Sequence, residues 1–130
     1  MIDHEAEYVD EVASAVLEKY PDAEITSDYV PMVSTFPHVY IRETNNASDT
    51  RSMPLVGREA TARLTYTVDV FSNAQSGRKA ECKAVMAIVD DVMQSHCFER
   101  TMLTPYPNQN DATIYRLVAR YTKLEEKIWR

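Results

Sequence analysis

Three histidines are the residues of this 130-residue chain that could act as acid–base groups or metal ligands. His4 is followed by Glu5, but the second histidine that a zinc-binding helix motif needs four positions on is Tyr8. His38 begins a predicted strand without a recognisable catalytic partner. His96 ends a predicted helix, where an imidazolium would favour the helix dipole, so capping is expected rather than metal ligation. Because no nucleophile, base and orienting group can be assembled from these positions, we expect the protein not to be an enzyme.

The cysteines, the adjacent Asp90 and Asp91, and the glycines point to no other reactive site. Cys82 and Cys97 form no CxxC pair, and two isolated thiols favour a reducing compartment. Asp90 and Asp91 are neighbours on a predicted helix, where they point about 100° apart, so both are expected to be solvated. Two glycines are too few for a phosphate-binding loop, a dinucleotide fingerprint or a nucleophile elbow. The sequence therefore predicts no catalytic residue, no metal ligand and no cofactor.

Apolar residues at helical spacing predict two helices, over residues 3–20 and 76–95. Pro21 ends the first helix, and Ser76 is the expected N-cap of the second. The apolar stripe of the first helix comprises Val9, Val12, Ala13, Val16, Leu17 and Tyr20. The stripe of the second comprises Cys82, Val85, Met86, Val89, Val92 and Met93.

Alternating apolar and polar residues predict strands, most clearly over residues 59–72. The other predicted strands cover residues 24–30, 38–44, 98–105 and 112–124. Two helices with one apolar stripe each can cover one face of a four- or five-stranded sheet. We therefore expect a single domain over residues 1–130, an α+β two-layer sandwich with a mixed or antiparallel sheet and both helices on one face. The uncovered sheet face would carry Arg63, Asp69, Arg116 and Arg120 among threonines.

Charge is distributed unevenly along the chain. Fourteen basic and 20 acidic residues give a net charge of −6, yet residues 1–28 hold nine acids against Lys19 alone, and the rest of the chain is net basic. This balance argues against sequence-independent nucleic-acid binding. The predicted acidic helix face is a docking surface for a basic partner or a solvated face; it comprises Asp3, Glu7, Asp10, Glu11 and Glu18. The predicted basic surface comprises Arg78, Lys79 and Lys83, with Arg116 and Arg120 on the sheet. A head-to-tail ring would bring such surfaces together.

Two further segments offer apolar residues to a partner. Residues 45–58 are a predicted long flexible loop in which Met53, Leu55 and Val56 form an apolar cluster. Residues 125–130 are a predicted C-terminal tail that holds Trp129, the only tryptophan. The loop is either a partner-binding segment or merely mobile, and Trp129 either contacts a partner or folds back onto the sheet. With no signal peptide or apolar run of about 20 residues, we expect no membrane association.

Several strings of residues resemble one family. They are residues 68–73 (Val-Asp-Val-Phe-Ser-Asn), residues 76–86, residues 100–102 and residues 107–121. In these strings the chain resembles the tail-completion, or tail-terminator, proteins of tailed phages and prophages, over about residues 60–122. The strings carry no catalytic chemistry, so they indicate a family rather than a mechanism.

The resemblance implies a structural role in the virion. Such proteins form a ring, typically of six subunits, at the head-proximal end of the tail tube. The ring stops tube polymerisation and presents a surface to the head connector. The implied partners are further copies of the chain, the tail-tube protein and the neck proteins. DNA would pass through the ring without specific recognition. The implied location is the virion tail, reached from the host cytoplasm. Two alternatives remain open: a head-closure or neck protein one ring further up, and a small hydrolase using His38 or His96.

The sequence departs from the family where the second helix ends. Residues 95–98 are Ser-His-Cys-Phe, whereas relatives usually show Leu-Gly-Phe. A glycine easily adopts the left-handed conformation that closes many helices. Without it, the path of the chain out of this helix cannot be assigned from the pattern.

Overall fold

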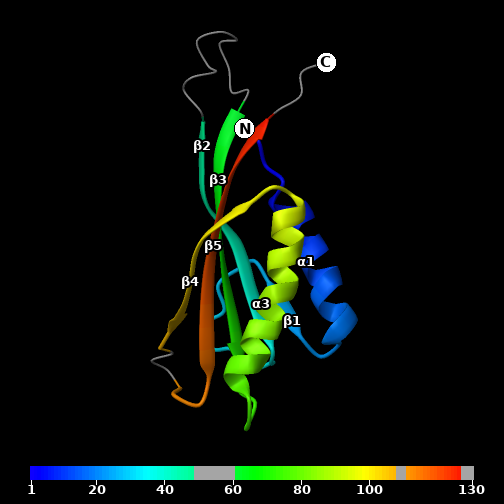
Figure 1. The fold of residues 1–130 in the computed structure, drawn as a ribbon, viewed down its shortest axis with the longest axis vertical. Coiled ribbons are helices and arrows are strands. Elements are labelled where there is room, and N and C mark those ends of the chain that lie inside the picture. The colour runs from blue at the N-terminus through cyan, green and yellow to red at the C-terminus, as the bar shows by residue number, and fades with distance from the viewer. Residues whose placement is uncertain (49–60, 108–110, 127–130) are drawn as a thin grey trace.

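The computed structural model describes residues 1–48, 61–107 and 111–126 as a two-layer α+β fold (Figure 1). Its elements in chain order are α1 (Glu5–Lys19), β1 (Glu24–Thr26), β2 (His38–Ser48), β3 (Thr61–Ser72), α3 (Arg78–Ser95), β4 (Glu99–Tyr106) and β5 (Tyr115–Glu126). The strand order is β1-β2-β3-β5-β4, with β1 parallel to β2 and the other neighbours antiparallel. Both helices pack against the sheet, so the predicted fold class is confirmed.

Several predicted boundaries are wrong because strand pairing extends into segments with poor strand propensity. β2 continues to Ser48, which pairs with Ala62, although Asn45 and Asn46 predicted a loop there. A register shift after Glu43 lets this pairing continue. β5 likewise runs to Glu126, so residues 125 and 126 of the predicted tail belong to the sheet. Conversely, β1 ends at Thr26 rather than at residue 30.

The core lies between the helices and one face of the sheet. The burial predicted for one face of β3 is confirmed, because its inward side chains are fully buried: Ala62, Leu64, Tyr66, Val68 and Val70. On the other face Thr67 and Asp69 are buried as well, which the alternation did not predict. On α3 the predicted stripe is also confirmed, except that Val92 is only partly buried. On α1 the stripe is rotated from the prediction: Tyr8, Val12 and Val16 are buried, whereas Leu17 is 40% exposed.

Both ends of α3 depart from the simplest cap assignments. The N-cap is Gly77, with φ of 76°, and not Ser76. At the other end, the Phe98 N–H donates to the Met93 carbonyl (3.1 Å) and the Cys97 N–H donates to the Gln94 carbonyl (3.0 Å). These two bonds form a Schellman motif, in which the residue directly after the C-cap adopts a left-handed conformation. Cys97 takes that place with φ of 67°, where glycine is usual.

Replacing Cys97 with glycine is therefore expected to stabilise the protein. A side chain in the left-handed region costs about 1–2 kcal/mol, and part of the relief is offset by the greater freedom of glycine in the unfolded chain. We expect a net gain of about 1 kcal/mol in the free energy of unfolding, measured by urea denaturation. Cys97→Ala is the control, because it removes the thiol but keeps the strained Cβ. An equal gain in both variants would show that backbone strain is not the cause.

The two thiols differ in environment, which predicts different reactivity. Cys82 is fully buried, and its Sγ lies 3.6 Å from the Val70 carbonyl oxygen. Burial, with the nearby Glu81 charge, raises the pKa of the Cys82 thiol to about 12. Cys97 is exposed. A thiol reagent at pH 8 should therefore label one cysteine of the native protein rapidly. Cys97→Ser should abolish this fast reaction, whereas a fast reaction that persists in the variant would contradict the buried placement of Cys82.

Candidate functional site

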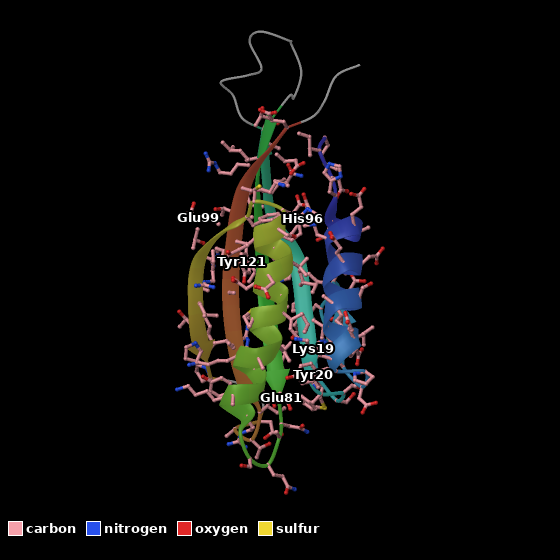
Figure 2. The ribbon with its side chains drawn as sticks, turned by 45° about the vertical axis from the view of Figure 1, so that its right-hand side comes forward. Lys19, Tyr20, Glu81, His96, Glu99 and Tyr121 are labelled. Carbon is pink, nitrogen blue, oxygen red and sulfur yellow. The ribbon has the colours of Figure 1, made fainter. Side chains whose placement is uncertain are left out.

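The two helices lie antiparallel, so the start of α1, with Asp3 and Glu7, and the basic first turn of α3 lie at opposite ends of the helical layer (Figure 2). Glu18 of the predicted acidic face lies instead in the last turn of α1, at the end where α3 begins. The C-terminal end of α3 lies against the first half of α1. The centroid of the His96 ring is 4.9 Å from that of the Tyr8 ring, and the His96 side chain pairs with Glu11. Figure 2 shows His96 toward one end of the layer and Glu81 toward the other, the end at which Lys19 and Tyr20 also lie. The first turns of α1 and the first turn of α3 are thus separated along the long axis of the molecule.

The acidic surface, which we define as Asp3, Glu7 and Glu11, lies at the start of α1, and all three side chains are exposed. Asp3 Oδ1 accepts the Glu5 N–H (3.2 Å), and Glu11 pairs with His96. The first contact is local and the second joins α1 to the end of α3, and both leave the carboxylates at the surface. Acidic residues at a helix N-terminus also interact favourably with the helix dipole.

A further carboxylate makes this end of the layer more acidic. Glu43 accepts a hydrogen bond from the Tyr66 hydroxyl (3.1 Å), and its backbone N–H donates to Glu5 (2.6 Å). Burial, together with the charges of Asp3 and Glu5, raises the pKa of Glu43. A basic group from another molecule would therefore be favoured at this end.

The basic surface, which we define as Arg78, Lys79 and Lys83, lies at the start of α3. Lys79 and Lys83 are exposed, whereas Arg78 is half-buried and donates to the Thr113 carbonyl (2.8 Å). Arg78 therefore also holds the segment before β5. Positive charges near a helix N-terminus are mildly unfavourable for that helix, so the two lysines contribute little to its stability.

The sheet face opposite the helices is not the simple exposed surface that the sequence predicted. Asp69 is only 1% exposed. Its Oδ1 accepts from Arg42 Nη1 (2.7 Å), and its Oδ2 accepts from Arg116 Nε (2.9 Å) and Nη2 (2.5 Å). Arg116 is thus part of an internal ion cluster rather than a free interface group, while Arg120 is exposed. The three residues converge because β2 and β5 both flank β3, which alternation within one strand does not reveal.

Each of the two histidines considered for catalysis lies near a carboxylate. His96 is the C-cap residue of α3, as expected, and its ring pairs with Glu11. His38 is 1% exposed; its Nε2 lies 3.0 Å from the Thr26 hydroxyl and its Nδ1 lies 3.9 Å from Glu24. Burial lowers the pKa of His38, so its imidazole is neutral near pH 7.

Asp90 is not simply solvated, which corrects another expectation. Its carboxylate accepts hydrogen bonds from the Tyr121 hydroxyl (2.8 Å), from Arg100 (2.8 Å) and from Gln94 (2.8 Å). Asp90 therefore joins α3 to β4 and β5. Its neighbour Asp91 is exposed, as expected for adjacent positions on a helix.

The remaining predicted contact residues, Met53, Leu55, Val56 and Trp129, lie outside the described residues. Within the described ranges, histidine, cysteine and carboxylate side chains form no group of three that could hold a metal ion. No helix in the same ranges is long and apolar enough to cross a membrane. No protein-family model matches the sequence, and no curated protein matches it.

Proposed function

We propose that this chain is a structural subunit of a phage tail, which assembles head to tail into a ring at the head-proximal end of the tail tube and stops its polymerisation. The observation that carries the proposal is the separation of the acidic and basic surfaces at opposite ends of the helical layer. The proposal assigns no catalytic step and no cofactor to the protein.

The separation of the acidic and basic surfaces favours ion pairs between two subunits over ion pairs within one subunit. α3 has 18 residues and is therefore about 27 Å long. Exposed charges that far apart are screened from each other at physiological salt, where the Debye length is about 8 Å. The acidic surface of one subunit and the basic surface of the next can instead lie in contact. Because such a contact joins two different surfaces, each subunit can bind the next in the same way. The assembly is a closed ring when the rotation from each subunit to the next returns to the first subunit.

The residues that carry the family resemblance also lie together in the fold. Residues 68–72 end β3, residues 78–86 begin α3, and residues 115–121 belong to β5. β3 pairs with β5 over its whole length, and α3 packs on both strands. The strings thus lie in elements that contact one another in one part of the domain. The six-subunit ring and its position on the tail rest on the resemblance.

The genetic test uses the phage or prophage that encodes the chain. Deletion of the gene should give tails of uncontrolled length, or tails that do not join heads, when lysates are viewed by electron microscopy. Complementation with the wild-type gene should restore tail length. Normal virions from the deletion strain would contradict the proposal. Co-purification with portal or adaptor proteins, rather than with tube protein, would instead place the chain in the neck.

A further inference from the structure

A hollow of about 420 Å³ lies on the sheet face opposite the helices, beside the ion cluster. Residues 29–33 form one wall of this hollow, in a segment between β1 and β2 that ends before the buried His38. The apolar groups that line it include Met32, Phe71 and Ile114. Its polar lining includes His38, Arg42 and Arg116. Small-molecule sites commonly combine an apolar lining with a few convergent polar groups in a volume of about 300–1,000 Å³.

The floor of the hollow has more hydrogen-bond donors than acceptors. Arg42 uses Nη1 on Asp69 and on the Tyr40 and Thr67 carbonyl oxygens (3.5 and 3.4 Å), and Arg116 uses Nε and Nη2 on Asp69. Within the described part of the chain, Arg42 Nε and Nη2 and Arg116 Nη1 meet no hydrogen-bond acceptor. The side chains of Arg42 and Arg116 are 23% and 34% exposed, so these donors are accessible from the hollow. Two guanidiniums on one carboxylate also leave a net charge of about +1.

His38 adds a polar atom that lacks a partner. Its Nδ1 is buried and makes no hydrogen bond with any described residue; the nearest carboxylate oxygen, on Glu24, is 3.9 Å away. When the Thr26 hydroxyl donates to Nε2, the ring proton of neutral His38 sits on Nδ1 and makes it a donor. A buried polar atom without a partner is unusual in a folded protein and calls for an acceptor.

We propose that this hollow binds a small organic carboxylate with an apolar or aromatic body. The carboxylate accepts from the free N–H groups of Arg42 and Arg116, and the body packs between the 29–33 segment and Phe71. Guanidinium groups suit this ligand because their planar donors match the geometry of a carboxylate. This site is separate from the surfaces invoked for ring assembly.

One acidic residue of the lining opposes anion binding, and its effect is small. Asp111 lines the hollow, but its carboxylate is exposed and accepts the Thr113 N–H (2.9 Å) and hydroxyl (2.6 Å). An exposed charge is screened by water, whereas the guanidiniums at the floor are partly desolvated. The floor therefore sets the preferred charge of the ligand.

The test titrates the full chain with 3-phenylpropionate and with its neutral isostere 3-phenylpropanamide, followed by two-dimensional amide NMR. We expect the carboxylate to bind at least about tenfold more tightly than the amide, as charge-assisted hydrogen bonds imply. The shifted resonances should include those of His38, Asp69 and Arg116. Equal binding of both probes, or shifts confined to other parts of the domain, would overturn the proposal.

Two sets of variants separate binding from folding. Arg116→Gln should weaken phenylpropionate binding about tenfold or more, and its amide spectrum reports whether it folds. Met32 is 79% exposed at the wall, so Met32→Glu and Met32→Gln should both fold normally. Both variants remove the same apolar contact and differ only in charge, so Met32→Glu should bind phenylpropionate about fivefold more weakly than Met32→Gln does. Equal affinity in the two Met32 variants would contradict a site that selects for negative charge.

Discussion

Replacing Asp69 with asparagine is expected to lower the free energy of unfolding by about 3 kcal/mol. The carboxylate is 1% exposed, and it receives three hydrogen bonds from Arg42 and Arg116. Removing its charge leaves two guanidiniums side by side without the anion between them. Breaking a fully buried pair costs about 3–5 kcal/mol; the value here lies at the low end because both arginines retain access to water. Urea denaturation at neutral pH measures the change.

The matched control is Arg63→Gln, which removes an exposed charge from the same strand. Its effect should stay within about 0.5 kcal/mol. If Asp69→Asn and Arg63→Gln unfold at the same urea concentration, the ion cluster does not stabilise the domain. A lower free energy of unfolding in Asp69→Asn alone would confirm that the buried ion cluster on the sheet face opposite the helices stabilises the domain.

Reversing the charges of Lys79 and Lys83 is expected to abolish association between subunits. In the proposed contact these lysines face the acidic surface of the next subunit, which includes Asp3 and Glu7. Like charges placed across an interface cost several kcal/mol, so Lys79→Glu with Lys83→Glu should weaken each contact about 100-fold or more. Sedimentation velocity at low and at physiological salt measures the change, and thermal unfolding should be nearly unaffected because both lysines are exposed.

A complementation experiment makes this prediction specific. The variant Asp3→Lys with Glu7→Lys should also fail to associate alone, but an equal mixture with the lysine-reversed variant should recover association. The control reverses two acidic residues near the other end of α1, Glu18 and Asp22; it keeps both contact surfaces and should associate alone as the wild type does. Loss of association in this control, or no recovery in the mixture of the two complementary variants, would contradict the proposed pairing of surfaces.

Local patterns predict the core elements of this fold because each pattern arises within one element. The alternation in β3 fixes which of its faces is buried, and the stripe of α3 fixes the side that packs on the sheet. On α1 the spacing predicted an apolar stripe that includes Val9 and Leu17, and the structure shows this helix rotated from that prediction. The observed rotation buries Tyr8, whose ring centroid lies 5.6 Å from that of Tyr66 and 5.2 Å from that of Phe98. That choice depends on side chains from other elements, which spacing along one helix does not contain.

The features that the sequence left unpredicted depend on contacts between distant segments. Asp69 is buried because Arg42 and Arg116 reach it from the two flanking strands and the 29–33 segment lies beside them. Cys97 adopts a left-handed conformation because the Met93 and Phe98 side chains are both buried and hold the turn in place. Of the predicted interface residues, the exposed lysines and acids could be placed by charge alone, whereas the internal role of Arg116 required the fold.

The most direct test of the proposed ring is electron microscopy of growing tail tubes to which the purified chain is added. The cognate tube protein is allowed to polymerise with the wild-type chain, with the variant reversed at Lys79 and Lys83, or with no addition. With the wild-type chain we expect a ring of added density at one end of each tube and shorter tubes, and with the variant we expect neither effect. Tubes that grow to the same length in all three samples, without density at an end, would contradict it.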